Sequence, residues 1–114
     1  MSSFKKLHEK WRKNREEARK NAALVKQRLL KEGTLVFKKY GIEMAVIFGS
    51  LAEERHTPTS DIDLLVRYLT NDKFYDFKRE LEDTIGGPID LYTDKDDTMF
   101  VNKIISRGEV IYEI

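Results

Sequence analysis

The sequence predicts an α/β fold, in which helices pack on a small sheet and a long helix precedes it. From residue 42 onward, short apolar runs alternate with stretches whose apolar residues recur every three or four positions, which is typical of strands alternating with helices. Before this alternation, residues 1–33 keep a helical apolar spacing without proline or internal glycine. We therefore expect an N-terminal helical arm at 1–33 and an α/β domain at 34–114.

The distribution of charge separates the same two parts. Residues 1–33 contain eleven Lys and Arg against four Glu, a net charge of +7. Residues 34–114 contain ten basic and sixteen acidic residues, a net charge of −6. The overall charge of +1 thus hides a basic arm on an acidic domain.

Composition excludes several classes of protein. The chain has no cysteine, so neither a disulfide framework nor a cysteine-based zinc site is possible. No apolar run approaches the roughly 18 residues that a membrane span requires, and the N-terminus lacks the apolar core of a signal peptide. At 114 residues, the chain has the length of one domain with a real core. We expect a soluble cytoplasmic protein without membrane contact.

The arm is predicted to form one helix, with Ser2-Ser3 as its N-cap and Gly33 as its stop. Leu24 and Leu30 widen its apolar stripe near the C-terminal end, where we expect it to dock on the domain. Three interpretations stay open: packing on its own domain, an interface with a partner or a second copy, and binding of RNA phosphates. The stripe itself consists of Phe4, Leu7, Trp11, Ala18, Ala22, Val25 and Leu29.

The domain is predicted to contain four strands with helices between them. Residues 34–40 form a second helix or the bent end of the first, and the connection 51–60 starts as a short helix. Asn71 or Asp72 caps a helix that Gly86-Gly87-Pro88 ends, and Asp94 to Asp97 begin the last helix. The strands are expected at 42–48, 61–68, 89–92 and 109–114.

One stretch carries the chemistry. The apolar run ending in Gly49-Ser50 is followed, after ten residues, by Asp61 and Asp63 at the start of a second apolar run. Alternate side chains of a strand share a face, so these two carboxylates point the same way and offer oxygen ligands to a hard cation such as Mg²⁺. A glycine turn from strand to helix leaves backbone N–H groups free for a phosphate. Together these features indicate nucleotide chemistry.

This pattern, with Asp90 as a third carboxylate in residues 88–92, resembles the minimal nucleotidyltransferase family of the DNA polymerase β superfamily. That family includes the antitoxin partners of HEPN-domain ribonuclease toxins. The resemblance covers residues 34–114, because residues 104–112 also resemble the family's last helix and strand. It implies a polymerase-β-like nucleotidyltransferase fold with a small mixed sheet, and it leaves residues 1–33 unexplained.

The resemblance also implies roles for the site residues. Asp61 and Asp63 would share two Mg²⁺ ions, and Asp90 would bind the ion that activates the attacking hydroxyl group. Gly49 and Ser50 would hold the β- and γ-phosphates of ATP. The chain is too short to contain an acceptor domain, so the implied reaction moves AMP to a hydroxyl, expected to be that of a tyrosine, on a HEPN toxin.

The sequence departs from the family just after Gly-Ser. Members commonly have an Ala-Arg-Gly run there, whereas this chain has Glu53-Glu54, with Arg55 as the candidate replacement for nucleotide binding. The departure keeps a second hypothesis open, an antitoxin that blocks its partner by contact alone. A third hypothesis is nucleotidyl transfer to RNA held by the basic arm. His56 has no evident catalytic partner and is expected to be an exposed loop residue, while His8 belongs to the polar face of the arm.

Overall fold

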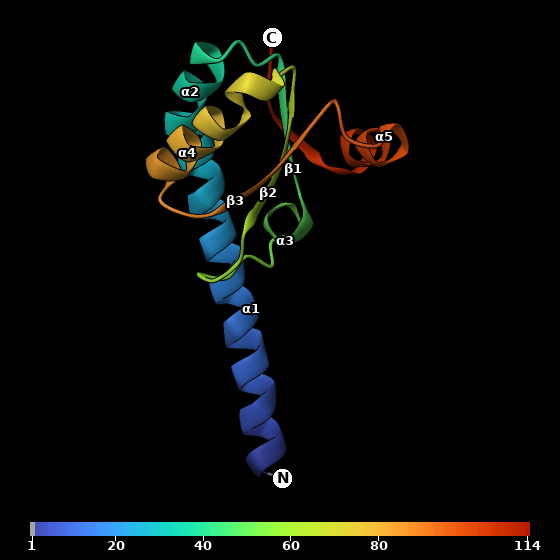
Figure 1. Ribbon diagram of the computed structural model, residues 1–114. Helices are drawn as coiled ribbons and strands as arrows, with labels where there is room; N and C mark the ends of the chain where they lie inside the picture. Colours follow the sequence, from blue (N-terminus) through green and yellow to red (C-terminus); the bar gives the residue numbers. More distant parts are fainter. Residues whose placement is uncertain (1) are drawn as a thin grey trace.

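The computed structural model describes residues 2–114, with side chains described from Phe4 onward. Figure 1 shows a small sheet with helices on both faces and a long N-terminal helix that projects away from it. The predicted fold class is thereby confirmed. The elements in chain order are α1 (Ser2–Arg28), the π turn η1 (Leu29–Gly33), α2 (Thr34–Lys39), β1 (Met44–Phe48), α3 (Gly49–Ala52), β2 (Ile62–Arg67), the 3₁₀ turn η2 (Asn71–Lys73), α4 (Phe74–Ile85), β3 (Ile89–Thr93), α5 (Thr98–Arg107) and β4 (Glu109–Glu113).

The sheet has four strands in the order β3-β2-β1-β4. Strand β1 pairs antiparallel with β2 and with β4, whereas β2 and β3 run parallel. The parallel pair is possible because α4 carries the chain from the end of β2 back to the start of β3. This topology brings the beginnings of β2 and β3 to the same end of the sheet as the end of β1.

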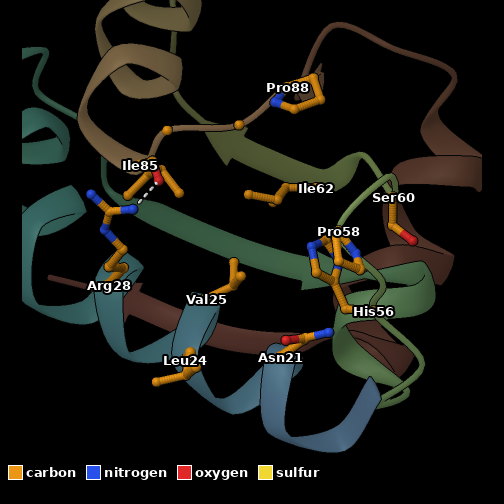
Figure 2. A pocket seen from close by; sticks show the side chains of 12 residues that line it. Asn21, Leu24, Val25, Arg28, His56, Pro58, Ser60, Ile62, Ile85 and Pro88 are labelled. Atoms are coloured by element: carbon orange, nitrogen blue, oxygen red, sulfur yellow. Dashed lines mark hydrogen bonds between the residues drawn. The ribbon is translucent and has the colours of Figure 1, made fainter. Parts of the chain in front are cut away.

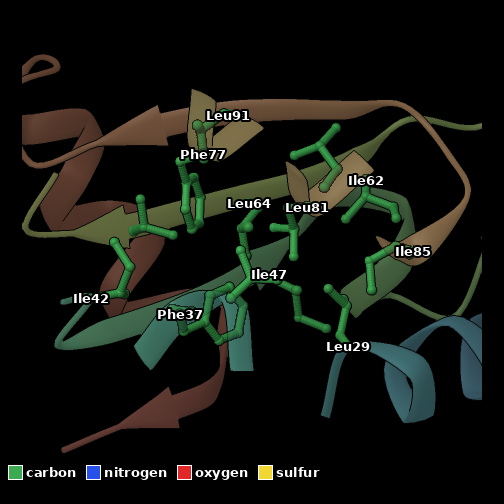
Figure 3. Close-up of a cluster of buried hydrophobic side chains, with 14 of the residues drawn as sticks. Leu29, Phe37, Ile42, Ile47, Ile62, Leu64, Phe77, Leu81, Ile85 and Leu91 are labelled. Carbon is green, nitrogen blue, oxygen red and sulfur yellow. The ribbon is translucent and has the colours of Figure 1, made fainter. Parts of the chain in front are cut away.

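The two faces of the sheet carry two separate apolar clusters. Ile47 and Leu64 belong to the larger cluster, under η1, α2 and α4, which Figure 3 shows together with Phe37 and Phe77. Val46 and Leu65 belong to a smaller cluster under α5, on the opposite face. Strands buried on both faces read as continuous apolar runs, and this explains why β1 shows no alternation in sequence.

The N-terminal helix does not stop at Gly33, so that part of the prediction is wrong. Gly33 is buried with helical backbone angles (φ −66°, ψ −31°), and the chain continues through the π turn into α2. Leu29 and Phe37, on either side of it, are completely buried in the larger cluster. Their packing favours a continuous helix and outweighs the low helix propensity of glycine. The helix ends at Gly41, where φ is +69°.

Only the C-terminal part of α1 packs on the domain. Ala22 is completely buried, and Lys26 forms an ion pair with Glu109 of β4 at 3.0 Å. Leu24 and Leu30 are exposed, so the predicted widening of the docked stripe is wrong, because the contact involves a narrower face of the helix. The N-cap predicted at Ser2-Ser3 concerns side chains outside those that the structure describes.

The projecting part of α1 carries an apolar stripe with no cover from residues 2–114. Phe4, Leu7 and Trp11 expose 74%, 44% and 57% of their surface. The molecule is accordingly elongated, with extents of 58 × 30 × 22 Å. No helix within residues 2–114 has both the length and the apolar character that crossing a bilayer demands.

Of the three helix ends predicted for α4 and α5 from capping and stop residues, two are confirmed. Gly86, with φ +81°, ends α4 as predicted, and the Asp97 carboxylate caps α5 by accepting from the N–H of Met99 at 2.9 Å. The cap predicted at Asn71 or Asp72 is wrong, because these residues form a 3₁₀ turn and no side chain caps α4.

Gly108 tests the packing between α5 and the sheet. A Cβ atom there would lie 2.6 Å from Val46 Cγ1 and 2.8 Å from the carbonyl oxygens of Ile47 and Ile104. We predict that Gly108→Ala lowers the free energy of unfolding by about 1–3 kcal/mol, because backbone atoms block relaxation. Gly87→Ala is the control, since a Cβ at Gly87 meets nothing within 4 Å. Denaturant unfolding measures both variants, and equal effects would contradict this account.

Candidate active site

The turn after β1 is shaped by Gly49. Its φ of +68° lies in the left-handed region, and a Cβ atom there would lie 2.2 Å from Asp63 Oδ2. Any other residue would therefore be strained and would collide with the carboxylate. The close approach follows from strand pairing, because Phe48, just before the turn, lies opposite Asp63 in the β1–β2 register.

Two of the three predicted carboxylates are paired on neighbouring strands. Asp63 and Asp90 are direct partners in the parallel β2–β3 register, while Asp61 lies just before β2 and is exposed. Burial raises the pKa of the half-buried Asp63 carboxyl, and the negative charges of Asp90 and Asp61 raise this pKa further. The three carboxylates therefore act on one another electrostatically at this end of the sheet.

Tyr92 belongs to this site, although the sequence analysis did not single it out. Its hydroxyl donates a hydrogen bond to Asp90 Oδ2 at 3.0 Å. Burial raises the pKa of the Tyr92 hydroxyl, and so does the bond to Asp90, which keeps Tyr92 protonated as a donor. The ring packs against Phe48 and Phe100, with centroid distances of 5.4 and 5.3 Å. The sequence could have indicated this role, because Tyr92 follows Asp90 by two residues and therefore lies on the same face of the strand.

The donor chemistry of the site fits a hard divalent cation. Carboxylate oxygens are the ligands that Mg²⁺ prefers. Burial first, and then the charges of Asp90 and Asp61, raise the pKa of Asp63, and a bound cation would offset both effects. Within residues 2–114, however, no group of three or more His, Cys, Asp or Glu side chains is gathered closely enough to hold a metal ion. Asp90 instead keeps its bond to Tyr92, and Asp61 faces solvent.

The two glutamates after the glycine turn are paired with arginines. Arg55 Nη2 contacts the Glu53 carboxylate, and Arg19 of α1 lies 3.5 Å from the Glu54 carboxylate. All four side chains are mostly exposed, so each pair contributes little stability. The pairs nevertheless compensate the negative charge that the sequence places beside the turn.

His56 is buried, so the prediction of an exposed loop residue is wrong. Only 5% of its surface is exposed, and its Nδ1 atom has no hydrogen-bond partner in the part of the chain that the structure describes. The residue is buried because the loop after α3 faces helix α1 across a cavity, as Figure 2 shows. Burial lowers the pKa of the His56 imidazole and favours its neutral form.

Comparison with known proteins assigns the family. Residues 35–114 match the family model of polymerase beta nucleotidyltransferases, so the chain belongs to that family. Among its relatives are two proteins of Methanocaldococcus jannaschii to which protein adenylyltransferase activity is attributed. One is 34% identical over 77 residues, covering 65% of this chain and 79% of the relative. The other is 37% identical over 75 residues, covering 63% and 76%.

Solved structures with the same fold come from toxin–antitoxin systems. A chain from a toxin–antitoxin crystal structure with AMP-PNP aligns with a TM-score of 0.63 and 17% identity, over 78% of this chain and 73% of that one. A chain from the complex of a tri-AMPylated Shewanella oneidensis HEPN toxin with its MNT antitoxin gives a TM-score of 0.56 and 16% identity, over 82% and 73%. The predicted resemblance to nucleotidyltransferases of this type is confirmed.

Asp63 provides a test of the electrostatics. Because its pKa in the folded protein lies above the ordinary 3.8, the ionised carboxylate opposes folding at neutral pH. We predict that Asp63→Asn raises the free energy of unfolding without Mg²⁺ by about 0.5 kcal/mol after solvent screening. Added Mg²⁺ should stabilise the wild type more than the variant. Thermal melts check both expectations, and Asp83→Asn on the exposed side of α4 is the control.

His56 provides a test by pH. Its pKa in the folded protein lies below the value of 6.5 expected when unfolded, so the unfolded chain binds a proton first as the pH falls. The stability contributed by neutral His56 is thus complete above pH 6.5 and is lost below it. We predict a smaller fall in melting temperature from pH 7 to pH 5 for His56→Phe than for the wild type. Parallel pH dependences would show that His56 is not buried.

Proposed function

We propose that this chain transfers AMP from Mg-ATP to a hydroxyl group, expected to be that of a tyrosine, on a partner HEPN toxin, and acts as its antitoxin in the cytoplasm. The observation that carries the proposal is the placement of Gly49 against Asp63, with Asp90 opposite on the next strand. Membership of the nucleotidyltransferase family and the activity attributed to its relatives support AMP transfer.

In this proposal, Asp61, Asp63 and Asp90 hold two Mg²⁺ ions. Bound Mg²⁺ supplies charge neutralisation for the phosphates and for the attacking oxygen. The Asp63 carboxylate packs against Gly49, and this contact sets the distance between the carboxylates and the glycine turn. Tyr92 orients Asp90 through its hydrogen bond, and the Phe48 and Phe100 rings hold Tyr92 in place.

The nucleotide phosphates are assigned to the turn after β1. Gly49 leaves the backbone open to a close approach by a phosphate, and the Ser50 hydroxyl is the adjacent donor. Arg55 remains the candidate cation for the phosphates. Its exposed pair with Glu53 is weak, below about 1 kcal/mol, so it can exchange the glutamate for a more highly charged triphosphate.

The acceptor and the recognition surface are assigned to a partner protein. Solved chains with this fold come from toxin–antitoxin complexes, one of which contains a tri-AMPylated HEPN toxin, and this supports a toxin as the acceptor. The projecting part of α1 offers an apolar stripe of Phe4, Leu7 and Trp11 on a basic helix. Stripes of this kind are typical of interfaces, so we assign it to the partner or to a second copy of the chain.

The same stripe favours a second candidate function, inhibition by contact alone. A helix that binds the toxin through Trp11 and its neighbours would block it without any transfer. The two functions differ in their dependence on the carboxylates, because contact inhibition needs none of them.

We predict that Asp63→Asn lowers AMP transfer at least about 100-fold, because a ligand for the catalytic ions is lost. The measurement is incorporation of label from α-labelled ATP, with Mg²⁺, in an extract of the native cell. Asp83→Asn, the same chemical change on the exposed side of α4, should leave incorporation unchanged.

The distribution of label decides between the candidates. Label on a protein that disappears with Asp63→Asn supports the transferase, and label on RNA would identify RNA as the acceptor instead. Retained transfer with Asp63→Asn would falsify the assignment of the site. Protection against the toxin by a chain with Asp61, Asp63 and Asp90 all changed to Asn would establish contact inhibition.

A further inference from the structure

A cavity lies on the other face of the sheet from Asp63 and Asp90. It has a volume of about 280 Å³ and opens between α1, the loop that leads into β2 and the turn between α4 and β3 (Figure 2). Four of its lining residues, Asn21, Leu24, Val25 and Arg28, belong to α1 and precede the family match at residues 35–114. The N-terminal helix therefore completes a cavity that the nucleotidyltransferase domain alone would leave open.

The walls of the cavity are largely apolar. Ile62 projects into it from the start of β2, and Ile85 from the end of α4. The rings of Pro58 and Pro88 add two flat, rigid surfaces near the sheet edge. Val25 of α1 forms the opposite wall. A flat apolar ring is the kind of group that such walls exclude from water.

His56 lines the cavity and carries a buried polar atom without a partner among residues 2–114. The residue is 95% buried, and its Nδ1 atom has no hydrogen-bond partner among residues 2–114. A buried polar atom without a partner costs about 1–3 kcal/mol. The Nδ1 atom has less than 1 Å² of accessible surface, so a ligand in the cavity reaches it only when the imidazole ring rotates toward the cavity, and a hydrogen bond to the ligand would then remove this cost.

Two side chains of α1 complete the polar part of the lining. The amide of Asn21 has both a donor and an acceptor, the combination that reads the edge of an adenine base. The Arg28 guanidinium is held by the Ile85 carbonyl oxygen at 2.8 Å and lies 3.4 Å from Glu32. Because these bonds fix its plane, it offers a planar cationic surface against which a ring can stack.

The volume agrees with a ligand of two fused rings. A cavity of about 150 Å³ accommodates benzene, so about twice that volume accommodates a purine. We propose that this cavity binds a purine base, as a free nucleoside or nucleotide or as an unpaired base of single-stranded RNA, with His56 and Asn21 at its polar edge and the proline rings against its faces. The site is separate from the carboxylates and does not depend on the proposed transfer reaction.

The experiment is an NMR titration of the full chain with adenosine, without Mg²⁺. Adenosine lacks the phosphates that the glycine turn is proposed to hold, so it probes the base alone. We expect saturable shifts in the Asn21 side-chain amide and the backbone amides of Gly86 and Gly87, with little change at Gly49 and Ser50. Absent shifts, or shifts confined to Gly49 and Ser50, would overturn the proposal.

Two variants test the chemistry of the cavity. His56→Phe keeps a ring but removes Nδ1, and we expect about tenfold weaker binding in a protein that melts no lower than the wild type. Gly87→Leu places a side chain where a Cβ has open space, and should block binding by filling the cavity. Unchanged affinity in both variants would overturn the proposal.

A matched variant and a second ligand complete the design. Asp63→Asn, on the other face of the sheet, should bind adenosine as the wild type does, and loss of binding there would place the ligand at the carboxylates. Parallel titrations with AMP and a short single-stranded oligoadenylate distinguish the sources of the base. The tighter of the two identifies whether a free nucleotide or an RNA strand is preferred.

Discussion

The contact between Gly49 and the Asp63 carboxylate is the constraint on which the acidic end of the sheet depends. The β1–β2 register places Asp63 beside the turn, and a Cβ at residue 49 would lie 2.2 Å from its oxygen. The turn, the strand pairing and the carboxylate therefore depend on one another, and a change in any of them would disturb the other two. The parallel β2–β3 pairing then adds Asp90. Asp63 and Asp90 are thus both placed by strands of the sheet, which hold side chains more rigidly than a surface loop does.

The two faces of the sheet have different roles, because one provides most of the apolar burial and the other carries the carboxylates. The face under η1, α2 and α4 contains the larger apolar cluster, with Phe37 and Phe77 fully buried. The opposite face carries a small apolar cluster under α5 along one part and the carboxylates at its end. Repelling charges such as Asp63 and Asp90 are tolerated because the other face provides most of the apolar burial. The aromatic group around Tyr92 forms the border between the two parts.

Local patterns predicted what depends on neighbours in sequence. The strands, the Gly86 helix end and the Asp97 cap followed from spacing and backbone preference. Apart from the cap predicted at Asn71 or Asp72, the errors concern contacts between distant segments. Gly33 remains helical because the core holds both sides of it, and His56 is buried because its loop faces α1. In the candidate site, the pairing of Asp63 with Asp90 required the strand order, and the role of Tyr92 required knowing which face of β3 meets α5.

The unbroken path from α1 through the π turn into α2 has a mechanical consequence. Leu29 and Phe37 anchor this path in the core, and Gly33 between them stays helical, so there is no hinge at the base of the arm. Residues 4–17 extend about 20 Å beyond the domain at 1.5 Å per residue. The helix therefore acts as a rigid spacer. Whatever binds at Trp11 is held at a set distance and direction from the carboxylates, and lengthening the arm by single residues would rotate that partner by about 100° per residue.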